Sequence, residues 1–150
     1  MLRPAVAADV VAVTDLVDAA YGHYVDRIGI LPGPMREDYA QVIATAKVTV
    51  ADHGGVLVGV LVLRISDQGL VIDNVAVHPS RQGTGLGRTL LEHAEETARR
   101  AGFDSIYLYT HEKMTENLTL YARIGYVEYE RRSQGDFALV FMRKKLTKNP

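Results

Sequence analysis

The stretch from residue 71 to residue 102 constrains the fold most, because a glycine-rich turn joins a predicted strand to a long predicted helix. The helix is expected over 86–101, where leucines and alanines recur at helical spacing. Glycines at 83, 85 and 87 adopt positive φ easily, so successive N–H groups can converge on one anion. The helix N-terminus adds unpaired N–H groups, and Arg81 and Arg88 add positive charge. The turn therefore predicts a phosphate or diphosphate site.

Two common phosphate-binding motifs do not fit this turn. A dinucleotide fingerprint that starts at Gly83 requires glycine at position 88, which is Arg88. The P-loop requires Gly-Lys followed by Ser or Thr, and the chain contains no such string. Both readings are therefore excluded residue by residue.

The composition narrows the chemistry further. The absence of cysteine excludes disulfides, thiolate metal sites and an acyl-cysteine intermediate. The formal net charge of −1 gives no reason to expect nucleic-acid binding. The N-terminal segment contains Asp9 and no long apolar block, so no signal peptide or membrane span is expected, and a cytoplasmic location is predicted.

The hydrophobic patterns predict one α+β domain over residues 1–150. Strands are expected at 2–3, 47–52, 56–64, 70–77, 105–110, 126–132 and 137–145. Helices are expected from Asp9 to about Ala20 and over 35–45, 86–101 and 115–123. His53-Gly54-Gly55 is typical of a hairpin turn, and the prolines near 27–38 indicate a loop.

The sequence resembles the GNAT superfamily of acetyl-CoA-dependent N-acetyltransferases. The family's acyl-CoA signature has Arg or Gln, two free positions, Gly, one free position, and Gly or Ala, and here it reads Gln82-Gly-Thr-Gly-Leu-Gly87. The NVAVHP strand end and the ENLTLYARIGY segment extend the resemblance. It implies a GNAT-like mixed, mostly antiparallel sheet of about six to seven strands, flanked by about four helices and splayed at the acyl-CoA site.

The resemblance also implies which residues hold the cofactor, acetyl-CoA. Backbone amides of Gln82, Gly83, Thr84, Gly85, Leu86, Gly87 and Arg88 would bind its pyrophosphate. Val75, Ala76 and Val77 would pair with the pantetheine arm, and the Val75 N–H would face the thioester carbonyl. Asn117 would contact the arm. The alternative is a structural strand–helix connection without a ligand.

Two residues are candidates for proton transfer. Tyr121 occupies the family position of a tyrosine that protonates the leaving thiolate, and it shares a helix face with Asn117. Its alternative is a packed helix aromatic. Asp73 is predicted to share a strand face with Val75 and Val77, either as a base or as a charge that holds the substrate ammonium. Its alternative is a hydrogen-bonded structural carboxylate.

The histidines offer no clear base and no metal site. His78 and His111 each follow a predicted strand and are read as polar loop residues. No paired histidine spacing indicates a metal, and the chemistry needs none.

The acceptor pocket is expected from the loop over residues 21–39. Tyr24, Arg27 and Tyr39 are the substrate candidates, with Arg27 available for a carboxylate, and the alternative is a solvated loop.

The predicted function is direct acetyl transfer to a primary amine of a small or amino-acid-like acceptor. A protein or peptide acceptor, a non-catalytic acyl-CoA-binding regulatory domain and a pure interaction module are the alternatives. A homodimer is plausible by analogy with the fold.

Overall fold

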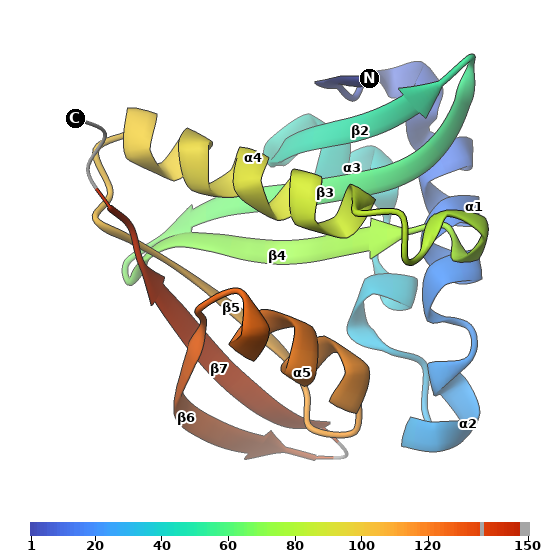
Figure 1. The fold of residues 1–150 in the computed structure, drawn as a ribbon. Helices are drawn as coiled ribbons and strands as arrows, with labels where there is room; N and C mark the ends of the chain where they lie inside the picture. The colour runs from blue at the N-terminus through green and yellow to red at the C-terminus, as the bar shows by residue number, and fades with distance from the viewer. Residues whose placement is uncertain (136, 148–150) are drawn as a thin grey trace.

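A computed structural model describes residues 1–135 and 137–147, and it contains one seven-stranded sheet in the order β1-β2-β3-β4-β5-β7-β6 (Figure 1). The strands are β1 (Leu2–Pro4), β2 (Lys47–His53), β3 (Val56–Ser66), β4 (Gly69–Val77), β5 (Ser105–His111), β6 (Val127–Gln134) and β7 (Phe137–Lys145). Among the described strands, β4 and β5 pair in parallel and the other pairs are antiparallel. The mixed, mostly antiparallel α+β fold is therefore confirmed.

Helices cover both faces of this sheet. The helical segments are η1 (Ala7–Asp9), α1 (Val10–Tyr21), α2 (Tyr24–Ile28), η2 (Gly33–Arg36), α3 (Tyr39–Thr45), η3 (Pro79–Arg81), α4 (Leu86–Arg100) and α5 (Thr115–Arg123). One hydrophobic core joins α1 and α3 to the sheet, and a second core joins α4 and α5 to the opposite face. The helix expected over 35–45 is instead split into η2 and α3, because Glu37 and Asp38 are extended.

Close packing against the sheet fixes the position of α4 and of its N-terminus. Leu90, Leu91 and Ala94 are fully buried against the sheet. Gly59 of β3 makes this approach possible, because a Cβ there would lie 3.0 Å from Leu90 Cδ1 and 3.3 Å from Leu86 Cδ2. The predicted helix is confirmed, except that Ala101 is exposed beyond its last turn.

The sheet splays open between β4 and β5. The two strands pair only through Leu70–Ile72 and Ile106–Leu108, and beyond these residues they separate. Figure 1 shows β5 and β7 turning away from β4, with α5 lying across the opening. The splay that the family resemblance implied is thus confirmed.

A β-bulge at Asp73 sets which side chains enter the splay. Val62 pairs with Asn74 but Leu63 pairs with Ile72, so Asp73 has no partner of its own on β3. Ile72 and Val75 both pack toward the core under α4. Asp73 and Asn74 both lie on the opposite face, where they contact Tyr109 and Tyr39. The expected alternation, with Asp73 beside Val75, is therefore wrong, because a bulge inserts an extra residue into the period of two.

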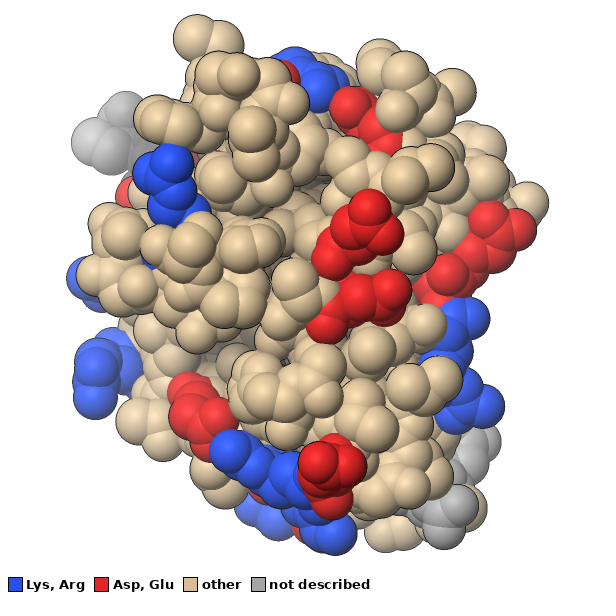
Figure 2. Space-filling view, turned by 90° about the vertical axis from the view of Figure 1, so that its right-hand side faces the viewer, with Lys and Arg blue, Asp and Glu red and all other residues tan. Residues whose placement is uncertain are grey.

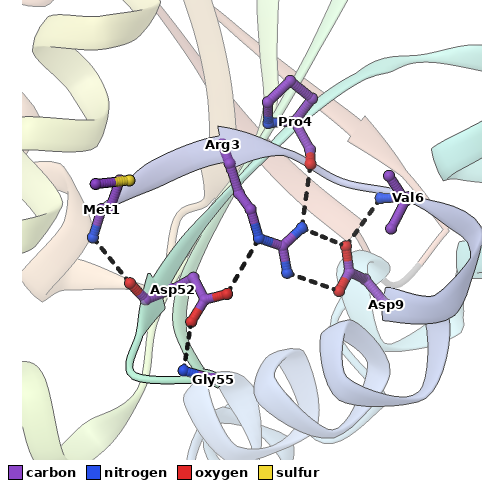
Figure 3. Close-up of polar contacts among 7 residues, drawn as sticks. All are labelled: Met1, Arg3, Pro4, Val6, Asp9, Asp52 and Gly55. Carbon is purple, nitrogen blue, oxygen red and sulfur yellow. Dashed lines mark hydrogen bonds and ion pairs between the residues drawn. The ribbon is translucent and has the colours of Figure 1, made fainter.

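An ion-pair network ties the first strand to its neighbours (Figure 3). The Arg3 guanidinium donates to Asp9 over 2.8 and 3.0 Å and to Asp52 over 3.1 Å. Asp9 also accepts from the Val6 N–H, and Asp52 from the Gly55 N–H. The Asp9 carboxylate is thus satisfied on both oxygens, which explains an acid buried at the start of α1.

Candidate active site

The glycine-rich turn presents a row of free backbone N–H groups. In the described part of the chain, the N–H groups of residues 83–88 have no hydrogen-bond acceptor, whereas the Gln82 N–H donates to Pro79 O over 3.4 Å. Gly83 and Gly85 have φ values of +79° and +89°, and Gly85 immediately precedes α4. A Cβ at either glycine would meet no protein atom within 4 Å. The turn is therefore not covered by other parts of the protein at these two glycines.

Positive side chains surround this opening. Arg81 and Arg88 line the same cleft as Gln82, Gly83 and Gly85. The hydroxyls of Thr84 and Thr89 are turned back onto the carbonyls of Arg81 and Gly85, so they stabilise the turn itself. Free amides, a helix N-terminus and two guanidinium groups together suit a diphosphate.

The cleft, which we call the cofactor cleft, runs from this turn along the end of β4. It has a volume of about 360 Å³ and is lined by Val75, Ala76 and Val77 and by residues of α1, α2, α4 and α5. Asn117, Leu120 and Tyr121 of α5 form its far wall. The predicted cofactor residues on β4, the turn and α5 therefore border one continuous space, apart from Thr84 and Leu86, which do not line it.

A second space, which we call the inner cavity, lies in the splay between β4 and β5. It has a volume of about 180 Å³. The segment from Ile28 to Val42 covers it, and Leu108 to Met114 and the start of β7 complete it. Tyr39 holds this cover, because its hydroxyl donates to Pro34 O over 2.6 Å and accepts from the Asn74 amide over 3.2 Å.

The cofactor cleft and the inner cavity meet at Tyr21, Val75, Asn117 and Tyr121, which line both. The Tyr21 hydroxyl is already bonded, at 2.7 Å from Asn74 Oδ1 and 3.0 Å from Val75 O. The Tyr121 side chain is 6% exposed, and its hydroxyl makes no hydrogen bond with the described residues. Burial raises the pKa of Tyr121, so the hydroxyl keeps its proton at neutral pH and can donate it.

Asp73 lines the inner cavity as a bonded carboxylate. It accepts from the Tyr109 hydroxyl over 2.5 Å and pairs with Arg64 Nε over 3.3 Å. Arg64 itself does not line the cavity, so the carboxylate is the member of this ion pair that borders the interior. This position suits the holding of a cation.

His111 is buried in the inner cavity rather than lying in a loop. It is the last residue of β5 and is 6% exposed. Its Nδ1 accepts the Lys113 N–H over 3.1 Å, so the proton of the neutral ring is on Nε2. In this tautomer His111 has no free lone pair with which to accept a proton. His78 caps the turn η3, where its Nδ1 accepts the Ser80 N–H.

The three predicted substrate residues fall in different places. Tyr39 lines the inner cavity. Tyr24 lines the cofactor cleft instead, and its hydroxyl donates to Glu116 over 3.1 Å. Arg27 pairs with Glu116 over 2.6 Å and borders a separate open groove. Arg27 is thus outside both spaces and engaged by another side chain.

Glu37 and Tyr21 line the inner cavity; both fall within the loop of residues 21–39 expected to form the acceptor pocket, but neither was singled out as a substrate residue. Glu37 follows a proline-rich loop, and its side chain borders the cavity while staying exposed. Tyr21 bonds to residues 53 and 54 positions away in the chain, and no local pattern indicates such a contact.

Three further observations on the described residues concern metal-ligating groups, membrane-spanning helices and surface charge. The described residues hold no group of three or more metal-ligating side chains placed to share an ion. Among the helices described, none combines the length and apolarity needed to cross a membrane. Figure 2 shows separate acidic and basic side chains on the face formed by α1 and α2, without a continuous basic surface.

The fold is shared with solved acetyltransferase structures. PaiA N-acetyltransferase from Thermoplasma acidophilum, in complex with coenzyme A, has a TM-score of 0.81 at 17% identity over 97% of this chain and 98% of that chain. A GNAT family acetyltransferase from Elizabethkingia anophelis with acetyl-CoA bound scores 0.74 at 19% identity over 97% of each chain. The ribosomal-protein-S18-alanine N-acetyltransferase from Escherichia coli scores 0.77 at 17% identity over 100% of this chain and 96% of that chain. At these identities the likeness concerns the fold.

The sequence comparison supplies the family. No curated protein matches this sequence. The sequence pattern of the acetyltransferase (GNAT) family matches residues 14–126, which include α1 from Thr14 onward, the splayed strands, the glycine-rich turn and α5. The chain is therefore a member of the GNAT acetyltransferase family.

Proposed function

We propose that this protein is an N-acetyltransferase that moves the acetyl group of acetyl-CoA to a primary amine of a small molecule. The observation that carries the proposal is the meeting of the cofactor cleft and the inner cavity at Val75 and Tyr121. One space begins at free amides suited to a diphosphate, and the other contains carboxylates suited to an ammonium group. Solved relatives with coenzyme A or acetyl-CoA bound support the choice of donor.

The residues of the cofactor cleft would position the donor. Amides of residues 83–88, with Arg81 and Arg88, would hold the diphosphate, and the edge of Val75–Val77 would pair with the pantetheine amides. Gln82 would border the donor, although its N–H and its side-chain amide already donate to Pro79 O and Val77 O, each over 3.4 Å. Asn117 would contact the arm near the junction.

The residues at the junction would carry the chemistry. The amine arrives from the inner cavity in its ammonium form. Asp73 either accepts its proton directly or holds the ammonium while a water molecule takes the proton, and the neutral amine then attacks. The Val75 N–H would stabilise the negative charge that develops on the thioester oxygen. Tyr121 would donate its proton to the leaving thiolate sulfur. Holding both reactants together would supply several kcal/mol, on the order of 7, of barrier reduction.

The whole chain, residues 1–150, is proposed to act as a single domain. Residues between Ile28 and Val42 border the inner cavity, whose volume is about 180 Å³. A space of this size favours a small molecule over a protein or peptide chain, which needs an open groove. A homodimer remains a prediction by analogy.

Release of coenzyme A from acetyl-CoA across a panel of amines tests this function. Turnover with at least one small amine is expected. If acetyl-CoA raises the melting temperature but no amine releases coenzyme A, the protein is a non-catalytic acyl-CoA-binding domain. If acetyl-CoA gives no thermal shift even at 100 times a typical Kd, where about 2.7 kcal/mol is expected, the glycine-rich turn is purely structural.

A further inference from the structure

The charges that line the inner cavity all have one sign. Asp73 and Glu37 are its only charged lining residues in the described chain, apart from the titratable His111. No lysine or arginine of residues 1–135 and 137–147 lines it. An occupant therefore meets two carboxylates and no permanent cation.

The negative charge of these carboxylates acts on two tyrosines that line the cavity. Burial first, and then hydrogen bonding and charge from Asp73 together with charge from Glu37, raise the pKa of Tyr109. Burial and the charges of Glu37 and Asp73 likewise raise the pKa of Tyr39, against the opposing hydrogen bond from Asn74. Tyr109 and Tyr39 come from β5 and α3, so the carboxylates act on tyrosines of two different elements that line the cavity.

Three arginines of neighbouring segments are already paired with other groups. Arg64 pairs with Asp73 itself over 3.3 Å and also donates to Thr45 Oγ1 over 3.4 Å. The Arg36 guanidinium lies 5.3 Å from the centre of the Phe137 ring, and Arg27 is paired with Glu116. None of the three lines the cavity, so an acceptor carboxylate would find repulsion and no ion-pair partner.

The remaining walls are largely apolar. They comprise Ile28, Val42, Val62, Ile72, Leu108, Met114, Phe137 and Leu139. The cavity volume of about 180 Å³ is below the roughly 300–1,000 Å³ of typical ligand pockets. The body of the occupant must therefore be small and apolar.

We propose that the acceptor is a small primary amine with an apolar alkyl or aryl body and no carboxylate. This inference rests on the proposed acetyltransferase function, and it narrows the acceptor by excluding free amino acids. The ammonium group lies toward Asp73 and Glu37, and the body fills the apolar walls. A carboxylate on the acceptor, about 5 Å from a cavity carboxylate at an effective dielectric constant of about 20, would be repelled. This repulsion should lower kcat/KM for a carboxylated acceptor by about a hundredfold.

Matched amines that differ only in the carboxylate test the proposal. The pairs are 2-phenylethylamine with phenylalanine, and tyramine with tyrosine. With the full chain and saturating acetyl-CoA, kcat/KM is expected to be about a hundredfold higher for the decarboxylated member of each pair. A lysine-containing peptide is expected to react more slowly than 2-phenylethylamine.

A variant that removes one charge distinguishes the effect of cavity charge on acceptor preference from the effect of cavity shape. Glu37→Gln should reduce the preference within each pair by about tenfold, because one of the two carboxylate charges is lost while the side chain keeps its size. Glu96→Gln is the matched control, since Glu96 lies on α4 and pairs with Arg99 and Arg100. It should leave the preference unchanged.

Binding to the coenzyme A complex gives a readout that does not need turnover. 2-Phenylethylamine should raise the melting temperature of this complex at concentrations where phenylalanine has no effect. Equal kcat/KM or equal binding within the pairs, or faster reaction of the peptide, would overturn the acceptor assignment and leave the acetyltransferase function standing. Selective amine binding without any release of coenzyme A would support the assignment and overturn the function.

Discussion

Gly85 offers a direct test of the glycine-rich turn, because the chain contains a matched control for its backbone strain. Gly85 has φ +89° and Gly102 has φ +88°, and a Cβ at either position meets no protein atom within 4 Å. They flank the two ends of α4. Replacement of either glycine should therefore cost the same strain, about 1–2 kcal/mol, without a steric clash.

The two positions should differ in coenzyme A binding. Gly85→Glu places a carboxylate beside the proposed diphosphate, and at about 5 Å with an effective dielectric constant of about 20 this repulsion is about 3 kcal/mol. The Kd for coenzyme A should rise by about a hundredfold or more. Gly102→Glu should leave the Kd unchanged.

Calorimetric titration and thermal melting check both parts. Each variant should lower the melting temperature by a similar amount, about 2–8 °C for a chain of this size. Unchanged affinity in Gly85→Glu, or an equal loss in Gly102→Glu, would refute the reasoning that the turn holds the diphosphate.

Three further predictions concern other parts of the molecule. Tyr121→Phe should lower kcat by about a hundredfold or more without changing the Kd for coenzyme A, whereas the exposed Tyr129→Phe should leave kcat unaltered; equal kcat in both variants would remove Tyr121 from the acid role. Gly59→Val should destabilise the protein by about 1–3 kcal/mol in urea unfolding, because its side chain meets Leu90, and a neutral effect would contradict the close packing of α4. The hydrogen bond from Arg3 holds the pKa of Asp9 below its ordinary value, so the ionised Asp9 stabilises the fold above about pH 4 and this stabilisation is lost as the pH falls. Asp9→Asn should therefore flatten the fall in melting temperature between about pH 4 and 2. An acid profile equal to that of the unaltered protein would refute this role of Asp9.

The parts of the fold that were predictable depend on short-range patterns. The spacing of leucine and alanine predicted α4, and Gly54-Gly55 predicted the turn between β2 and β3, where both glycines have positive φ. The free amides of the turn at 83–88 also follow from local sequence, because glycine and a helix N-terminus are enough to produce them.

The parts that were missed depend on contacts between distant segments. The bulge at Asp73 is defined by its pairing with β3, and the period of two within β4 contains no sign of it. Arg27 was assigned to the substrate because its partner, Glu116, lies 89 residues away. Glu37 enters the inner cavity only because the cover folds over the splayed strands. In each case the relevant energy comes from tertiary packing that no local window contains.

A crystal structure of the protein with coenzyme A tests the central claim most directly. We expect non-bridging oxygens on both phosphorus atoms of the diphosphate to lie within hydrogen-bond distance of N–H groups between Gly83 and Arg88, with the sulfur near the Tyr121 hydroxyl. A diphosphate bound elsewhere, or a sulfur remote from the junction of the two spaces, would contradict the account.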